Sequence, residues 1–169
     1  MKISVVYSSK SGNTLSVAEK IKEEVEYIEY FGEPSNDAAD SDLIFVGFWT
    51  DKGKCSKEIE EFLHTLHGKA IALFGTAGFG GDKSYFDKIL SAVKAEIPSD
   101  NRVYEGFMCQ GRMPSAVRAR YEKMLEKDPN NIQFITLINN FDSALSHPDN
   151  NDFENAKKWA NDVISFYNN

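Results

Sequence analysis

Short apolar runs alternate with helical segments along this chain, and that alternation restricts the possible folds more than any other feature. The runs lie at residues 3–7, 43–49, 70–74 and 103–109 and are rich in β-branched and other apolar residues. Continuous runs of this kind are typical of strands that are buried on both faces of a parallel sheet. A weaker, alternating segment at 27–30 predicts a further strand nearer an edge.

Segments with apolar residues at helical spacing lie between these runs. They occur at about 15–25, 59–66 and 86–97, and three more follow the last run. Strands that alternate with helices imply parallel pairing through right-handed crossovers. The sequence therefore predicts an α/β fold, a three-layer α/β/α sandwich with about five strands. The length of 169 residues fits a single domain spanning 1–169, and no linker divides it.

The chain is acidic. Its 26 aspartates and glutamates outnumber 19 lysines and arginines, giving a formal net charge of -7. This balance argues against nucleic acid as a partner, because phosphate backbones require clustered cations. No apolar run approaches the roughly 18 residues of a membrane-spanning helix, and Met1 leads directly into a strand-like segment. We therefore expect a cytoplasmic protein that does not associate with membranes.

The two cysteines, Cys55 and Cys109, lie too far apart in the sequence for a CxxC motif or a zinc cluster. They follow the third and fifth expected strands, which places them about two interstrand spacings apart, or ~10 Å. A disulfide does not span that distance without loop movement. We expect two free thiols, with Cys109 in the core.

The polar segment after the first apolar run is the strongest candidate for a ligand site. It places three hydroxyls, one amide and a glycine at the start of the first helix: Ser9, Lys10, Ser11, Gly12, Asn13 and Thr14. Unpaired N–H groups and the helix dipole favour a phosphate there. Without a Walker lysine or a GxGxxG pattern, the segment predicts a terminal monophosphate. The alternative is an ordinary cap, in which Ser11 or Thr14 satisfies the helix donors.

Residues 7–14, YSSKSGNT, resemble the phosphate loop of flavodoxins, which reads roughly (T/S)-x-(T/S)-G-N-T. The resemblance covers about residues 1–109 and the last helix. It implies FMN as cofactor, a five-stranded parallel sheet of order 2-1-3-4-5, and electron transfer. Open α/β sheets bind ligands at the carboxyl ends of their strands, and flavodoxin is itself a known example of this rule.

The loop after residues 43–49 corresponds to the flavodoxin loop that places an aromatic side chain on the flavin and a flexible peptide near N5. The resemblance implies stacking by Trp49 and a peptide contact at Gly53, with Thr50 in the same loop. An isoalloxazine ring requires aromatic faces and main-chain hydrogen bonds, so the residue types are suitable. The alternative is that Phe48 and Trp49 are core residues at a strand end.

Four of the eleven glycines lie in residues 75–81, and a close approach of the backbone to a flat ligand would account for them. Residues 81–85, GDKSY, are similar to the flavodoxin G-D-x-x-Y loop, whose tyrosine covers the outer flavin face. The loop is longer here, which makes Phe79 a competitor for that role. The alternative is a flexible connection with the tyrosine packed on its own helix. The expected contacts are Gly75, Thr76, Ala77, Gly78, Phe79, Gly81 and Tyr85.

A helical insertion at about 112–148 departs from simple flavodoxins, which run from the fifth strand almost directly into the last helix. Arg112, Arg118 and Arg120 cluster in this part of an otherwise acidic chain. They form either a docking surface for a reductase, a contact for an anionic substrate or nucleotide, or a solvated helix face.

The expected function is FMN-dependent, low-potential electron transfer, with a reductase and an acceptor enzyme as redox partners. No residue stands out as a catalytic nucleophile or base, because the flavin carries the redox chemistry. Two alternatives remain open: an NAD(P)H-dependent FMN or quinone reductase of the same fold, and a binding module that has lost its flavin. The expected assembly is a monomer or a weak dimer.

Overall fold

The computed structural model describes residues 1–169 and contains a parallel sheet flanked by helices. The strands are β1 (Ile3–Tyr7), β2 (Tyr30–Gly32), β3 (Leu43–Trp49), β4 (Ala70–Ala77), β5 (Arg102–Val103) and β6 (Phe107–Gln110). The helices are α1 (Asn13–Glu24), α2 (Asn36–Ala39), α3 (Lys57–His64), α4 (Lys83–Lys94), α5 (Ser115–Lys127), α6 (Ile132–Ala144) and α7 (Asn150–Asn168).

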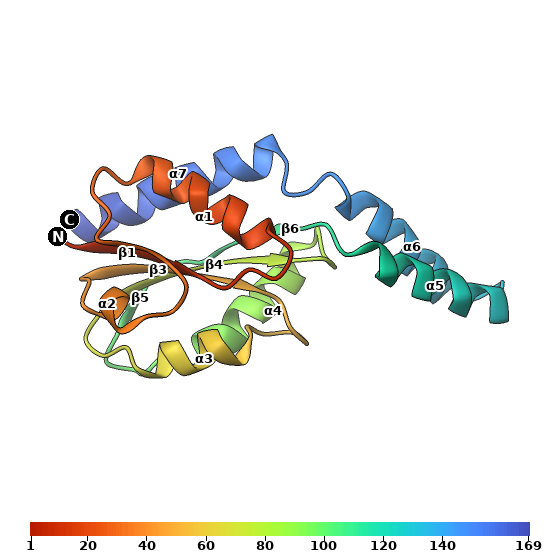
Figure 1. Ribbon diagram of the computed structural model, residues 1–169, viewed down its shortest axis with the longest axis horizontal. Helices are drawn as coiled ribbons and strands as arrows, with labels where there is room; N and C mark the ends of the chain where they lie inside the picture. Colours follow the sequence, from red (N-terminus) through yellow and green to blue (C-terminus); the bar gives the residue numbers. More distant parts are fainter.

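The strand order is β2-β1-β3-β4-β5, with β6 also paired to β4, so the expected order 2-1-3-4-5 is confirmed. Figure 1 shows α1 and α7 on one face of the sheet and α3 and α4 on the other. Each face has its own core, which matches strands that are apolar on both sides. Phe48 and Ile59 belong to the core under α3 and α4, whereas Phe45 and Val17 belong to the core under α1 and α7.

The sheet separates the two cysteines. Cys55 lies in the core under α3 and α4, and Cys109 lies in the core under α1 and α7. Both are free thiols and Cys109 is in the core, as expected from the sequence, and Cys55 is buried as well. No helix combines the length and the apolarity that are needed to cross a membrane.

The fifth position of the sheet differs from the single strand expected at 103–109. Val103 pairs with Ile71, and Phe107 pairs with Phe74. Between these pairs, the three residues 104–106 of the edge segment lie opposite the two residues 72–73 of β4. The extra residue separates β5 from β6, as in a bulge, because it cannot be paired without shifting the register. The second strand also differs: it starts at Tyr30, three residues later than the expected segment.

Residues 112–147 form a helical hairpin, here called the arm, which extends away from the sheet (Figure 1). The guanidinium of Arg118 on α5 donates two hydrogen bonds to the Asp142 carboxylate on α6, at 2.8 and 3.1 Å. The N–H of Arg112 donates to the carbonyl of His147 at 2.9 Å, which joins the two ends of the arm at its base. No residue of α5 is buried.

Candidate functional site

The segment from Ser9 to Thr14 connects β1 to α1 and leaves the start of the helix available to a ligand. Gly12 is the N-cap in the left-handed conformation, with φ +87°, and no side-chain cap bond is made there. A Cβ added at Gly12 would meet nothing within 4 Å, so the space over the loop is open. The Ser9 hydroxyl accepts a hydrogen bond from the N–H of Leu15 at 3.2 Å. This arrangement suits an anion at the helix N-terminus.

The alternative of an ordinary cap by Ser11 or Thr14 does not describe this helix start. The hydroxyl of Ser11 accepts from the Asn13 amide at 3.1 Å. The hydroxyl of Thr14 is hydrogen-bonded to that of Thr76 at 2.9 Å, and both side chains are buried. The Asn13 side-chain oxygen is buried without a partner. Thr14 and Thr76 therefore contribute to the site through their position and main chain, because their side chains face each other.

The loop after β3 meets the phosphate loop directly. The Lys10 ammonium lies 4.9 Å from the centre of the Trp49 ring, which is half-buried. The main chain and the hydroxyl of Thr50 both donate to the carbonyl of Thr76, each at 2.9 Å. Phe48 is fully buried, so the core alternative holds for Phe48 and not for Trp49. An aromatic face thus lies beside the candidate phosphate site.

A tight turn follows Trp49, and main-chain hydrogen bonds hold its conformation. Asp51 and Lys54 exchange two main-chain hydrogen bonds, of 2.8 and 3.1 Å. Lys52 and Gly53 between them both have positive φ, 49° and 87°, as a type I′ turn requires. Gly53 is exposed, and a Cβ there would meet nothing within 4 Å. The conformation of the turn accounts for the glycine, and its exposed peptide faces open space.

The Lys54 side chain fixes this turn to the helices on one face of the sheet. Its ammonium lies 2.5 Å from the Glu60 carboxylate on α3 and 2.8 Å from that of Glu96, just beyond α4. His64 is also 3.0 Å from Glu96. Hydrogen bonds from these partners raise the pKa of Lys54 and lower that of Glu96. The lysine occupies the position that a cation would take among these acids.

The glycine-rich segment after β4 has structural reasons for several of its glycines. Gly75 lies buried in β4, and a Cβ there would come within 2.6 Å of the Phe48 ring. Thr76 and Ala77 are also buried strand residues. A Cβ at Gly78 would come within 2.3 Å of Met113. Packing therefore accounts for Gly75 and Gly78 without a ligand, and only the later part of the loop is exposed.

Two aromatic side chains meet at the exposed part of this loop. Phe79 and Tyr85 contact each other edge to face, with ring centres 5.8 Å apart, and Phe79 is the more exposed. Gly81 has φ +90° and lies in open space. Asp82 caps α4: the N–H and hydroxyl of Ser84 bond to it and hold its pKa below the ordinary value.

A contact that sequence reasoning missed joins the arm to both ligand loops. The Asn13 amide donates to the carbonyl of Arg112 at 2.8 Å. The amides of Gln110 and Asn140 both donate to the carbonyl of Gly78 at 3.1 Å. Asn140 is 62 residues away in sequence from Gly78, and no local pattern marks such a pair.

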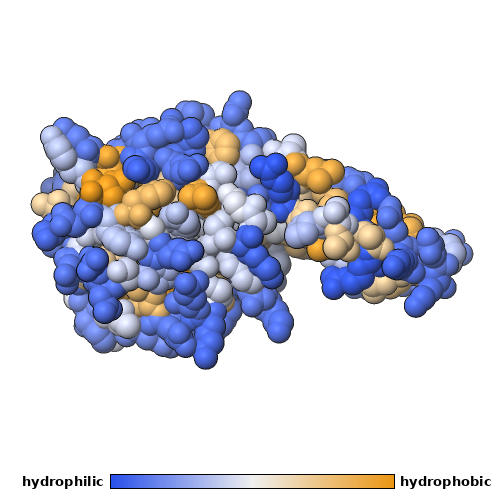
Figure 2. Space-filling view, in the orientation of Figure 1, coloured by the Kyte–Doolittle hydropathy of each residue, from blue (hydrophilic) through white to orange (hydrophobic).

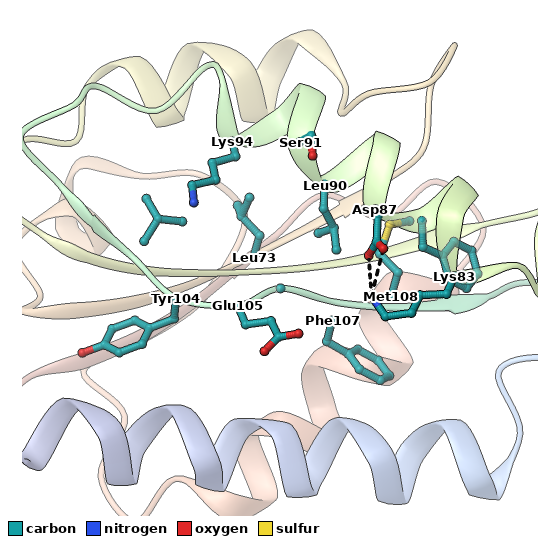
Figure 3. Close-up of a pocket in the computed structure, with 13 residues that line it drawn as sticks. Leu73, Lys83, Asp87, Leu90, Ser91, Lys94, Tyr104, Glu105, Phe107 and Met108 are labelled. Atoms are coloured by element: carbon teal, nitrogen blue, oxygen red, sulfur yellow. Dashed lines mark hydrogen bonds and ion pairs between the residues drawn. The ribbon is translucent and has the colours of Figure 1, made fainter.

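A separate cavity of about 400 Å³ lies between α4 and the split edge of the sheet (Figure 3). Leu73, Leu90 and Met108 contribute apolar surface, and Lys83 is paired with Asp87 at its margin. None of the residues expected to contact a flavin lines this cavity. The candidate site is therefore distinct from this cavity and consists of the loops that contain Gly12, Trp49 and Phe79.

A doubly wound parallel sheet with an uncapped, hydroxyl-rich loop after β1 and aromatic loops after β3 and β4 defines a flavodoxin-like protein. The chain belongs to the flavodoxin domain family, whose model matches residues 4–161. It is 34% identical to the flavodoxin-like domain-containing protein BilS of Clostridioides difficile, over 97% of each chain. It is 39% identical to BilS of Clostridium symbiosum, over 90% of each chain.

Solved flavodoxin structures show the same fold. Oxidised flavodoxin 1 from Bacillus cereus matches with a TM-score of 0.59 and 20% identity, over 98% of both chains. A flavodoxin from the domain Archaea matches with a TM-score of 0.57 and 19% identity, over the whole of both chains. A Lactobacillus acidophilus flavoprotein in complex with FMN matches with a TM-score of 0.50 and 19% identity, over 64% of this chain and 92% of that one.

Proposed function

We propose that this protein binds FMN and carries electrons between redox partner proteins. The observation that carries the proposal is the start of α1: Gly12 is left-handed, no side chain bonds the main-chain donors of Asn13 and Thr14, and Lys10 of the same loop lies over the half-buried Trp49. The donors suit a phosphate group, and the indole suits one face of a flavin. Family membership supports the same cofactor.

Different residues around the site would hold different parts of FMN. Ser9, Ser11 and the main chain of residues 11–14 would hold the phosphate, with Lys10 as the nearby cation. Trp49 would cover one face of the ring, and Tyr85 or Phe79 the other. Bound FMN would supply reversible electron transfer, while the protein sets its access and electrostatic surroundings. No side chain of the site is required as a nucleophile or general base.

The redox partners we propose are a reductase that supplies electrons and an enzyme that accepts them. The acidic surface, from a net charge of -7, would favour partners with basic docking faces. Asp51 lies in the turn beside Trp49. A carboxylate there would disfavour negative charge on a reduced flavin. At ~8 Å and an effective dielectric of ~20, one such carboxylate contributes roughly 2 kcal/mol.

Calorimetric titration with FMN and with riboflavin tests the phosphate site. We expect FMN to bind more tightly than riboflavin. The Ser11→Asp variant adds a carboxylate at the phosphate loop and should weaken FMN by about tenfold or more, while riboflavin binding stays unchanged. Ser99→Asp is the matched control, because Ser99 is an exposed serine in the turn before β5. Equal affinity for FMN and riboflavin, or binding of neither, would refute the proposal.

Adding NADPH to the FMN-loaded protein separates a carrier from a reductase. A carrier should be reduced only after a partner reductase is supplied, because hydride transfer needs a nucleotide seated over the flavin. Rapid bleaching of the flavin by NADPH alone would instead assign the chain to the NAD(P)H-dependent reductases of this fold. The absorbance of the oxidised flavin provides the measurement.

A further inference from the structure

The arm projects from the rest of the molecule, and hydrophobic side chains lie among the hydrophilic ones along it (Figure 2). The side chain of Asn140, on α6, contacts the loop after β4. Its amide nitrogen donates to the carbonyl of Gly78, and its amide oxygen accepts from the Gln110 side chain, each at 3.1 Å. Gln110 is only 7% exposed and donates to the same Gly78 carbonyl at 3.1 Å. Two amide groups thus hold one carbonyl and also hold each other.

The bound carbonyl determines where the next main-chain donor points. The Gly78 carbonyl and the N–H of Phe79 belong to one peptide group, which is trans. In a trans peptide these two groups point in opposite directions. Because the carbonyl is held by Gln110 and Asn140, the N–H of Phe79 points away from both amides. This N–H donates to no main-chain carbonyl of the chain, so it is available to a ligand.

This donor lies at the edge of the sheet that carries the other candidate contacts. Thr76, two residues before Gly78, pairs in register with Trp49 at the end of β3. The base of the arm also contacts the phosphate loop, where the Asn13 amide donates to the carbonyl of Arg112 at 2.8 Å. The arm therefore contacts loops on two sides of the candidate site.

We propose that Asn140 is a positioning residue for the flavin. Through the Gly78 carbonyl, it orients the N–H of Phe79 toward an acceptor atom on the polar edge of the flavin ring. A donor that is fixed before binding loses less conformational entropy on binding than a mobile one does. This inference rests on the proposed FMN site and assigns the arm a part in holding the cofactor. Asn140 itself would act through Gly78 without touching the flavin.

The variant Asn140→Leu keeps the approximate size of the side chain and removes both of its hydrogen bonds. Its affinity for FMN should fall about two- to tenfold, the equivalent of one hydrogen bond. Its affinity for riboflavin should fall by the same factor, because the two ligands share the ring. Asn140→Asp should behave similarly, since it presents an oxygen in place of the N–H to the Gly78 carbonyl. Quenching of flavin fluorescence on titration with protein gives both affinities.

The matched control is the same pair of substitutions at the preceding residue, Asn139→Leu and Asn139→Asp. Asn139 lies on the same helix and is exposed. Both control variants should bind FMN and riboflavin like the wild type. Helical content by circular dichroism should be the same for all of these proteins, because neither position belongs to the two cores of the sheet.

The amide of Phe79 provides a signal that a purely structural role of Asn140 would not change. At saturating FMN, NMR should show slow exchange of this amide with solvent in the wild type and in Asn139→Leu. The exchange should stay fast in Asn140→Leu, because the N–H is no longer held toward the ring. In the protein without FMN, the ¹⁵N relaxation of Phe79 should already show greater mobility in Asn140→Leu than in the wild type.

The outcomes separate this inference from the proposed function. If the wild type binds FMN and the two Asn140 variants bind it equally well, this inference alone is overturned. Equal protection of the Phe79 amide in Asn140→Leu and the wild type at saturating FMN also overturns it, as does equal weakening by the Asn139 variants. A wild type that binds neither FMN nor riboflavin overturns the proposed function and this inference together.

Discussion

The hydroxyl groups of Thr14 and Thr76 lie 2.9 Å apart and join the first turn of α1 to the carboxyl end of β4. The two residues are only 1% and 3% exposed. The candidate phosphate loop is thereby fixed to the centre of the sheet. The carbonyl of Thr76 also accepts from Thr50, so one residue of β4 contacts the loops on both sides of the site.

Thr76→Val should destabilise the fold by about 1–3 kcal/mol, because it leaves the buried Thr14 hydroxyl without a partner. Replacing both residues by valine removes the unsatisfied group, so the double variant should lie closer to the wild type than the sum of the two single variants. Urea unfolding of all four proteins measures this coupling. Strictly additive effects would show that the hydrogen bond contributes nothing.

Lys54→Met should lower the free energy of unfolding at neutral pH. It should also make that free energy fall less steeply as the pH decreases. The Lys54 ammonium, followed by His64, lowers the pKa of Glu96 below its ordinary 4.5. A depressed pKa gives stability that is present above pH 4.5 and is lost as the pH falls through the folded-state pKa. Without Lys54, the pKa of Glu96 should be less depressed, so less stability should be lost as the pH falls. Chemical unfolding between pH 3.5 and 7 provides the measurement, and parallel profiles for both proteins would contradict it.

Trp49→Leu should lower the affinity for FMN by about two- to tenfold, the equivalent of ~0.5–1.5 kcal/mol of aromatic stacking. Phe166→Leu, a change at an exposed aromatic residue of α7, is the control and should bind normally. Quenching of flavin fluorescence on titration with protein gives the affinity. If Trp49→Leu binds FMN as the wild type does, the ring is covered by other residues.

Neither cysteine should react with a thiol reagent in the native protein at pH 8. Burial raises the pKa of Cys55 to about 11, and burial also raises that of Cys109. A thiol is reactive mainly as the exposed thiolate, so both should be slow. Two thiols should be released when the protein is unfolded in denaturant, with no prior reduction. Fast labelling of either residue before unfolding would contradict the buried positions.

The sheet was predictable because its strands are apolar on both faces. The runs that contain Phe45 and Phe74 can be recognised as buried strands from their apolar composition. The alternation of these strands with helices then predicts parallel pairing. The second strand was less predictable, because Tyr30 to Gly32 are only half-buried and carry little hydrophobic signal. The interruption between β5 and β6 comes from one extra residue opposite β4, and register of this kind is not encoded in a local pattern.

The candidate site was predictable to the level of its loops and not of its side-chain contacts. The hydroxyl-rich loop is predictable because a helix start after the first strand is a specific context. The glycine pattern predicts ligand approach at residues 75 and 78, whereas Phe48 and Met113 occupy the space beside them. Pairing of Asn140 with Gly78 depends on how the arm returns to the sheet, which short-range sequence cannot show.

The hydrogen bond between Arg112 and His147 has a consequence for how the arm is coupled to the rest of the chain. Since the arm leaves and re-enters the α/β framework at one point, its outer part can differ in length or sequence with few changes in the framework. Near its base, however, Asn140 and Met113 contact Gly78 of the loop after β4. A change at the base of the arm therefore reaches the candidate site through this loop.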